Sequence, residues 1–137
     1  MFSSRTLLAA ATTVAVTALL LTGCAGASQS TKQACASLNK DLSLAAADLS
    51  SAFNNVQSDP KGAEKSLSKF DAALKAANSK VSNATIKTAT SATITAVDKM
   101  DVALNAYVKN PTSTSDLEKT AIGVQTAFSK LGGLCAA

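Results

Sequence analysis

Apolar residues recur three and four positions apart through four stretches of this chain, and this spacing limits its fold more than any other feature. In the first stretch the spaced residues are Cys35, Leu38, Leu42, Ala45, Leu49, Ala52 and Val56. Spacing of this kind places side chains on one face of an α-helix. Because such a face is stable only when another apolar face covers it, the pattern predicts several helices that pack together.

The second stretch has a clear starting point. The chain between the two stretches reads Gln57-Ser58-Asp59-Pro60, in which Asp59 is a good cap for a following helix and Pro60 suits its first position. The predicted helix runs from Pro60 to about Val81. Its inner face carries Ala63, Leu67, Phe70, Leu74 and Ala77.

The third stretch gives two opposing signals. Residues 86–95 are rich in β-branched side chains, which favour strands. The helical spacing nevertheless continues through Ile86, Thr90, Thr93, Val97, Met100, Leu104 and Tyr107. We therefore expect a helix that ends at Lys109-Asn110, because the residue before Pro111 avoids the α conformation.

The fourth stretch begins with Ser115-Asp116-Leu117-Glu118, which has the S-x-x-E pattern of a capping box. Its inner face carries Leu117, Ala121, Val124, Phe128 and Leu131, and we expect Gly132-Gly133 to end the regular helix. The connections between the four stretches are short, which favours antiparallel neighbours. The predicted fold is an all-α, up-down-up-down four-helix bundle with an alanine-rich core. The bulky core members are Phe53, Phe70, Tyr107 and Phe128.

The amino-terminal segment has the features of an export signal. Arg5 is followed by residues 7–21, LLAAATTVAVTALLL, which are apolar and uncharged. The next residues, Leu21-Thr22-Gly23-Cys24, resemble the lipobox of bacterial lipoproteins. The resemblance implies cleavage after Gly23 and a diacylglyceryl thioether on Cys24. The alternative is an ordinary signal peptide cut beyond Cys24, for instance after Ala27.

This interpretation divides the chain into a signal peptide (1–23), a lipidated flexible tether (24–32) and a helical bundle (33–137). The chain has three cysteines, of which lipid would occupy Cys24. Cys35 and Cys135 remain near the two ends of the bundle. Disulfides persist outside the cytoplasm, and an even number of antiparallel helices brings these two ends together. We therefore expect a Cys35–Cys135 disulfide.

Composition argues against catalysis. The chain contains no histidine, which is the usual general base and a common metal ligand. Asp98 and Asp101 share one helix face without a lysine four residues on, and we interpret them as solvated residues. No pattern of residues indicates a cofactor or a metal site, and we expect that the protein is not an enzyme.

The favoured function is a monomeric, membrane-anchored binding module at the cell envelope, with an envelope protein or an anionic envelope polymer as its partner. Lys61, Lys65 and Lys69 form a positive stripe that could offer an interaction surface, although a solvated lysine face is the default interpretation. Without interleaved aromatic residues the stripe is poorly suited to nucleic acid. The alternative function is a small-molecule or lipid carrier with a pocket at Thr90, Thr93 and Met100. The simpler interpretation of the two threonines is a hydroxyl bonded to a carbonyl one turn back.

Overall fold

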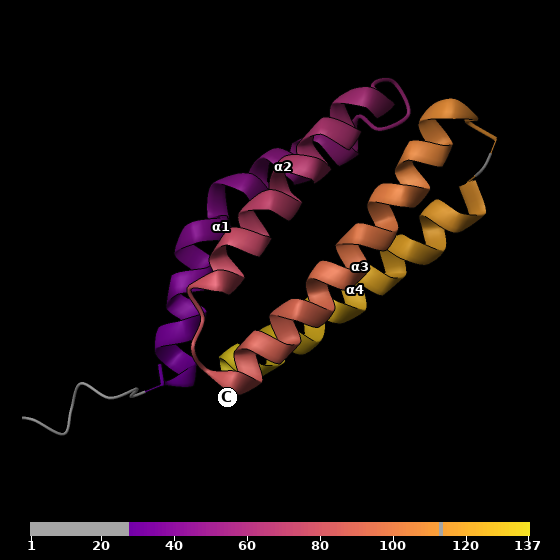
Figure 1. The fold of residues 1–137 in the computed structure, drawn as a ribbon. Coiled ribbons are helices and arrows are strands. Elements are labelled where there is room, and N and C mark those ends of the chain that lie inside the picture. Colours follow the sequence, from indigo (N-terminus) through magenta and orange to yellow (C-terminus); the bar gives the residue numbers. More distant parts are fainter. Residues whose placement is uncertain (1–27, 113) are drawn as a thin grey trace, which may run out of the picture.

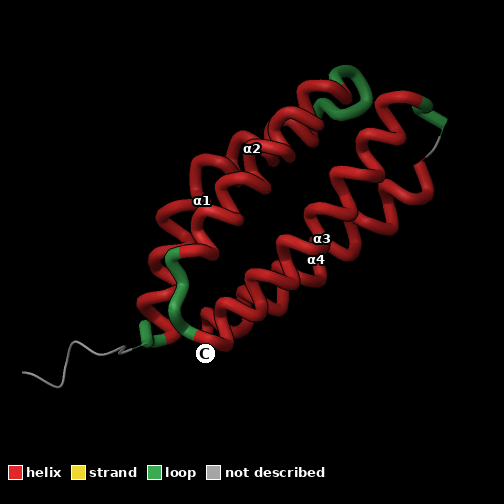
Figure 2. The backbone as a smooth tube through the Cα atoms, viewed as in Figure 1, coloured by secondary structure: helices red, strands yellow, loops and turns green. Residues whose placement is uncertain are grey.

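The computed structural model describes residues 28–112 and 114–137. The expected signal peptide and Cys24, the expected site of lipid attachment, lie outside these residues. The described chain forms four helices, α1 (Thr31–Asn54), α2 (Pro60–Ser79), α3 (Ala84–Lys109) and α4 (Thr114–Ala136). Successive helices run in opposite directions, and the connecting loops alternate between the two ends of the molecule (Figures 1 and 2). The predicted all-α four-helix fold is confirmed.

The first helix begins inside the stretch that was expected to be a tether. Ser30 caps it, since the Ser30 hydroxyl accepts a hydrogen bond from the Gln33 amide at 3.2 Å and the Gln33 side chain accepts one from the Ser30 amide at 3.0 Å. Gln29 is also fixed, because its backbone amide donates to the Ser82 hydroxyl and its side-chain oxygen accepts from the Ser82 amide. The boundary between tether and bundle therefore lies before Thr31, not at residue 33.

The predicted start of α2 and the predicted helical conformation of α3 are confirmed. The Asp59 side chain accepts a hydrogen bond from the Gly62 amide at 2.9 Å, and Pro60 is the first residue of α2. Asn83 caps α3 in the same way through the Ile86 amide at 3.0 Å. Helix α3 forms despite its β-branched residues because its apolar face is buried against its neighbours, and tertiary burial overrides a weak local preference.

Two predictions about the ends of α4 are wrong. The helix already includes Ser115, and within the described residues no hydrogen bond joins Ser115 to Glu118, so the expected capping box is absent. The helix also continues through Gly132-Gly133 to Ala136. A glycine costs only about 1 kcal/mol within a helix. This cost is small enough for α4 to continue to the disulfide.

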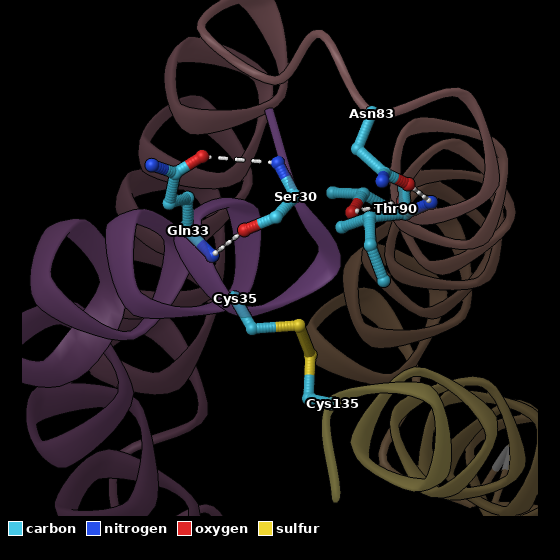
Figure 3. The surroundings of a disulfide bond; sticks show 7 residues. Ser30, Gln33, Cys35, Asn83, Thr90 and Cys135 are labelled. Atoms are coloured by element: carbon cyan, nitrogen blue, oxygen red, sulfur yellow. Dashed lines mark hydrogen bonds between the residues drawn. A yellow bond between two sulfur atoms is a disulfide. The ribbon is translucent and has the colours of Figure 1, made fainter. Parts of the chain in front are cut away.

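The disulfide between Cys35 and Cys135 is present, as predicted. It joins residues 100 positions apart and holds their Cα atoms 5.6 Å from each other. Figure 3 shows that it links the first turns of α1 to the last turn of α4, near the capping pair Ser30 and Gln33. The two outermost helices are thus covalently joined at one end of the bundle.

The core is formed mainly by the central helices. Buried apolar residues include Ala63, Leu67, Phe70, Leu74 and Ala77 of α2, and Ile86, Val97, Met100, Ala103 and Leu104 of α3. Of the four aromatic residues expected in the core, Phe70 is buried, whereas Phe53, Tyr107 and Phe128 are only partly buried. Phe53 lies on α1 and Phe128 on α4, and these two helices have little contact with each other, which leaves both rings only partly covered.

Candidate functional site

An open groove runs between α1 and α4, starting at the disulfide. Its first part has a volume of about 530 Å³ and its second part about 370 Å³. Both parts are lined by Ala46, Phe70 and Phe128, so they adjoin at these three residues. We call it the α1–α4 groove. It ends in the part lined by Leu49 and Phe53.

The floor of the α1–α4 groove is the protein core itself. Leu67 and Phe70 of α2 and Val97 of α3 are buried, and all three line the groove. The walls are half-buried apolar side chains, including Leu49 of α1 and Phe128 of α4. The Phe70 and Phe128 rings pack at a tilt with their centroids 5.7 Å apart. A closed bundle would cover these side chains with a direct α1–α4 contact, which is largely missing here.

Charge is confined to one end of this groove. Among the described residues that line it, Lys32 alone carries a charge, and it lies in the part next to Cys35 and Cys135. The other polar lining residues are Asn39, Ser43 and Ser50 on α1. The groove therefore offers a cation at the disulfide end and an apolar surface along the rest of its length.

A larger furrow of about 810 Å³ lies between α3 and α4, but it differs in kind. Its lining consists mostly of alanine, threonine and glycine, with Lys99 and Lys130, and it includes none of the buried core residues. Several of its threonine hydroxyls, such as that of Thr88, bond to carbonyls of their own helix. This furrow is the space beside small side chains, whereas the α1–α4 groove lies directly over buried core residues of α2 and α3.

The structure does not place Thr90 and Thr93 in a pocket. Both are fully buried, and neither lines the α1–α4 groove or the α3–α4 furrow. The Thr90 hydroxyl donates to the Ile86 carbonyl at 2.8 Å, and the Thr93 hydroxyl donates to the Ala89 carbonyl at 3.0 Å. Their hydroxyls thus bond one turn back, as the simpler interpretation predicted. Of the three proposed pocket residues, only Met100 lines the groove.

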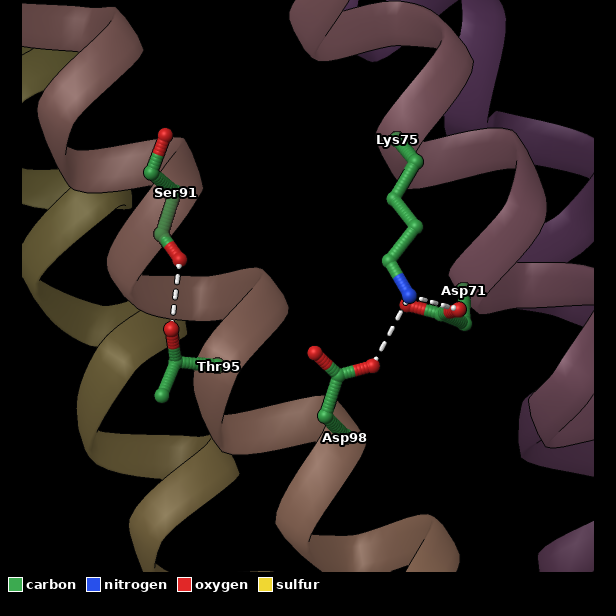
Figure 4. Close-up of polar contacts among 5 residues, drawn as sticks. All are labelled: Asp71, Lys75, Ser91, Thr95 and Asp98. Atoms are coloured by element: carbon green, nitrogen blue, oxygen red, sulfur yellow. Dashed lines mark hydrogen bonds and ion pairs between the residues drawn. The ribbon is translucent and has the colours of Figure 1, made fainter.

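Asp98 of α3 is paired with a lysine of α2 and is also exposed to solvent. The Lys75 ammonium of α2 lies 2.7 Å from an Asp71 carboxylate oxygen and 2.9 Å from one of Asp98, as Figure 4 shows. These two hydrogen bonds raise the pKa of Lys75. The expectation that no lysine pairs with Asp98 is therefore wrong, because Lys75 comes from the neighbouring helix, whereas the Asp98 side chain is solvated as predicted, at 53% exposed.

Asp101 lies near the same charged residues, and its pKa is also shifted. Its pKa is raised by partial burial and, to a lesser extent, by the negative charge of Glu64 and other carboxylates. Across the described ranges 28–112 and 114–137, no group of three or more histidine, cysteine or acidic residues is arranged to hold a metal ion. The Lys75–Asp98 pair joins α2 and α3 electrostatically.

The lysine stripe of α2 remains a surface without an identified ligand. Lys61, Lys65 and Lys69 are all exposed, and within the described chain none of them forms an ion pair. The structure places them on one accessible face of α2, as their spacing predicted. An anionic partner for this face stays a prediction.

Comparison with known proteins gives no further information about this site: no family model, no curated protein and no solved structure matches the chain. None of the helices within the described residues has the length and apolar character needed to cross a bilayer.

Proposed function

We propose that this protein is a lipid-anchored binding module on the extracytoplasmic face of a bacterial membrane, and that it binds its ligand in the α1–α4 groove. One observation carries the proposal: core residues of α2 and α3 line a groove that remains open between α1 and α4. A concave, mostly apolar lining of this kind is typical of a ligand or partner site.

The lining of the groove supports binding rather than catalysis. No aspartate, glutamate or histidine lines it, and its two cysteines are joined in the disulfide. General acid–base chemistry requires a titratable group within hydrogen-bond reach of the substrate. The single ammonium of Lys32 supplies attraction for an anion but has no partner group to act as a base.

The proposed anchor agrees with the position of the groove. The described chain starts at Ser28, close to the capped start of α1 and therefore to the disulfide end of the groove. Cys24 lies four residues earlier, which corresponds to at most about 14 Å of extended chain. A lipid on Cys24 would hold the Lys32 end of the groove near the membrane surface.

The location can be tested by fractionation of the producing cell. We expect the native chain to sediment with membranes, with an intact mass equal to residues 24–137 plus diacylglyceryl. The variant Cys24→Ser should lose the lipid and the membrane association. An unlipidated native chain that begins beyond Cys24 would exclude the anchored location.

The use of the groove can be tested by photo-crosslinking in the same cells. The photoreactive residue p-benzoylphenylalanine replaces Ala46, which lines both parts of the groove, or Ala47, which lines neither. Both positions are exposed on α1. We expect a discrete adduct from position 46 that is absent from position 47. Identical labelling from the two positions would contradict a binding role for the groove.

A further inference from the structure

We infer that the α1–α4 groove holds one acyl chain of an anionic phospholipid, with the phosphate at Lys32 and the hydrocarbon running past Phe128 toward Phe53. The inference rests on the proposed function and specifies its ligand. Three features of the groove favour this ligand: its width, the hydrogen-bonding state of its walls and the position of its charge.

The disulfide limits the width of the groove. It holds the Cα atoms of Cys35 and Cys135 5.6 Å apart, so α1 and α4 are nearly in contact at this end. A docked helix is about 10 Å in diameter and would have to force these two helices apart. A single hydrocarbon chain packs at carbon–carbon distances of about 4 Å and needs much less room.

The walls of the groove also disfavour an extended peptide. Both walls are α-helices, whose backbone amides and carbonyls are already paired within each helix. A peptide strand in this groove would bury its own backbone groups with few partners, because among the described lining residues Asn39, Ser43 and Ser50 alone carry uncharged polar side chains. A hydrocarbon chain has no hydrogen-bonding groups, so its burial in the groove breaks no hydrogen bonds to water.

The length and the charge of the groove match an anionic lipid. The stretch of α1 from Cys35 to Phe53 is about 27 Å long. Half of a bilayer's hydrocarbon core is about 15 Å thick, so the groove can accept an entire acyl chain. The only charged lining residue, Lys32, stands at the end that the proposed anchor would hold near the membrane. The acyl chains proposed on Cys24 carry no anionic headgroup, so they would leave the Lys32 ammonium without an anionic partner.

The test uses the chain purified from its membrane and reconstituted into phosphatidylcholine vesicles that contain a trace of photoactivatable phospholipid. The probe is phosphatidylglycerol with a diazirine near the end of one acyl chain, and the labelled residues are located by mass spectrometry of peptides. We expect adducts on the segment around Leu49 and Phe53. A diazirine close to the glycerol should label the segment around Leu131 instead.

Two matched pairs of variants make the result specific. Ala46→Phe fills the middle of the groove and should lower labelling about tenfold, whereas Ala47→Phe should leave it unchanged. Lys32→Gln should lower labelling by phosphatidylglycerol about threefold, and Lys40→Gln, on the same helix but outside the groove, should have no effect. Circular dichroism and thermal melting establish that each variant is folded.

Three outcomes would contradict the inference or part of it. Adducts spread over the outer helix faces, or unchanged by Ala46→Phe, would exclude an acyl chain in the groove. Equal labelling by photoactivatable phosphatidylcholine would exclude selection for an anionic headgroup. A protein adduct at position 46 in cells, without groove labelling by lipid, would overturn this inference while supporting the proposed binding module.

Discussion

The α2–α3 interface and the α1–α4 interface are built differently, although all four helices carry the same spacing of apolar residues. Helices α2 and α3 bury most of the core, including Leu67, Phe70 and Leu104. Helix α4 buries only Leu131, and α1 buries only Ala34, Leu38 and Leu42. The central interface is held by packing, whereas the outer one is held at one end by a covalent bond.

This difference shows how a small bundle can keep an apolar groove open. Close packing of α1 on α4 would bury Leu49 and Phe128 and stabilise the fold, but it would remove the binding surface. The disulfide fixes the two helices relative to each other without covering their inner faces. Stability and ligand access are thus assigned to different parts of the molecule.

The largest effect should come from equal truncations in the two interfaces. Leu67→Ala removes a fully buried side chain of α2, and we expect it to lower the free energy of unfolding by about 3–4 kcal/mol. Leu49→Ala removes a half-buried side chain of the groove wall and should cost about 1 kcal/mol. Urea unfolding followed by circular dichroism measures both. Equal losses would mean that the outer interface is as well packed as the central one.

Removal of the disulfide should separate the outer helices. The double variant Cys35→Ala/Cys135→Ala releases a loop of 100 residues, and we expect it to lower the free energy of unfolding by about 2–4 kcal/mol. Hydrogen exchange should increase most in the first turns of α1 and the last turns of α4. Reduction of the native chain should reproduce both effects. Unchanged protection at these two ends would show that packing alone holds α1 against α4.

Glycine substitutions should have opposite effects in the two halves of the bundle. Gly133 lies within α4, and a Cβ atom there would meet nothing within 4 Å. Gly133→Ala should therefore raise the free energy of unfolding by about 0.5–1 kcal/mol. At Gly62 a Cβ atom would collide with the Asp59 carboxylate that caps α2, so Gly62→Ala should cost about 1 kcal/mol. A destabilised Gly133→Ala variant would indicate that α4 is not helical at its end.

The smallest predicted effect concerns Asp101 at the α2–α3 surface. Because its pKa is raised in the folded state, the ionised form is less favourable there than in the unfolded chain. This penalty is present at neutral pH and disappears as the pH falls through the folded pKa toward the ordinary value of 3.8.

Asp101→Asn should therefore raise the free energy of unfolding at pH 7 by no more than about 0.5 kcal/mol. The gain should vanish below pH 3.8, when the carboxyl group is protonated in both states. Urea unfolding at both pH values measures it, with Asp48→Asn on the exposed face of α1 as the control. A gain that persisted at the lower pH would have a cause other than charge.

Several features of the fold could be predicted because they depend on nearby residues. The spacing of apolar residues identified all four helices, and Asp59-Pro60 marked the start of α2 correctly. The intrahelical bonds of Thr90 and Thr93 were also predictable, because a threonine hydroxyl can reach the carbonyl one turn back in any helix. The end of α4 could not be predicted in this way. The energetic cost of two glycines within the helix had to be compared with the stabilisation from a disulfide to a distant cysteine.

The groove had no comparable signal in the sequence. The inner residues of α1 and α4 would suit a closed bundle equally well, so their spacing does not reveal whether the two helices touch. The partner of Asp98 had no local signal either, because Lys75 comes from α2 and not from a neighbouring turn of α3.

The sequence by itself determined that this chain forms four antiparallel helices whose ends are joined through Cys35 and Cys135, because helical periodicity and short connections act locally. The tertiary structure decided which inner faces become core and which become the walls of a groove. Burial depends on how closely two distant helices approach, and that distance is set by the packing of the whole bundle together with one covalent bond.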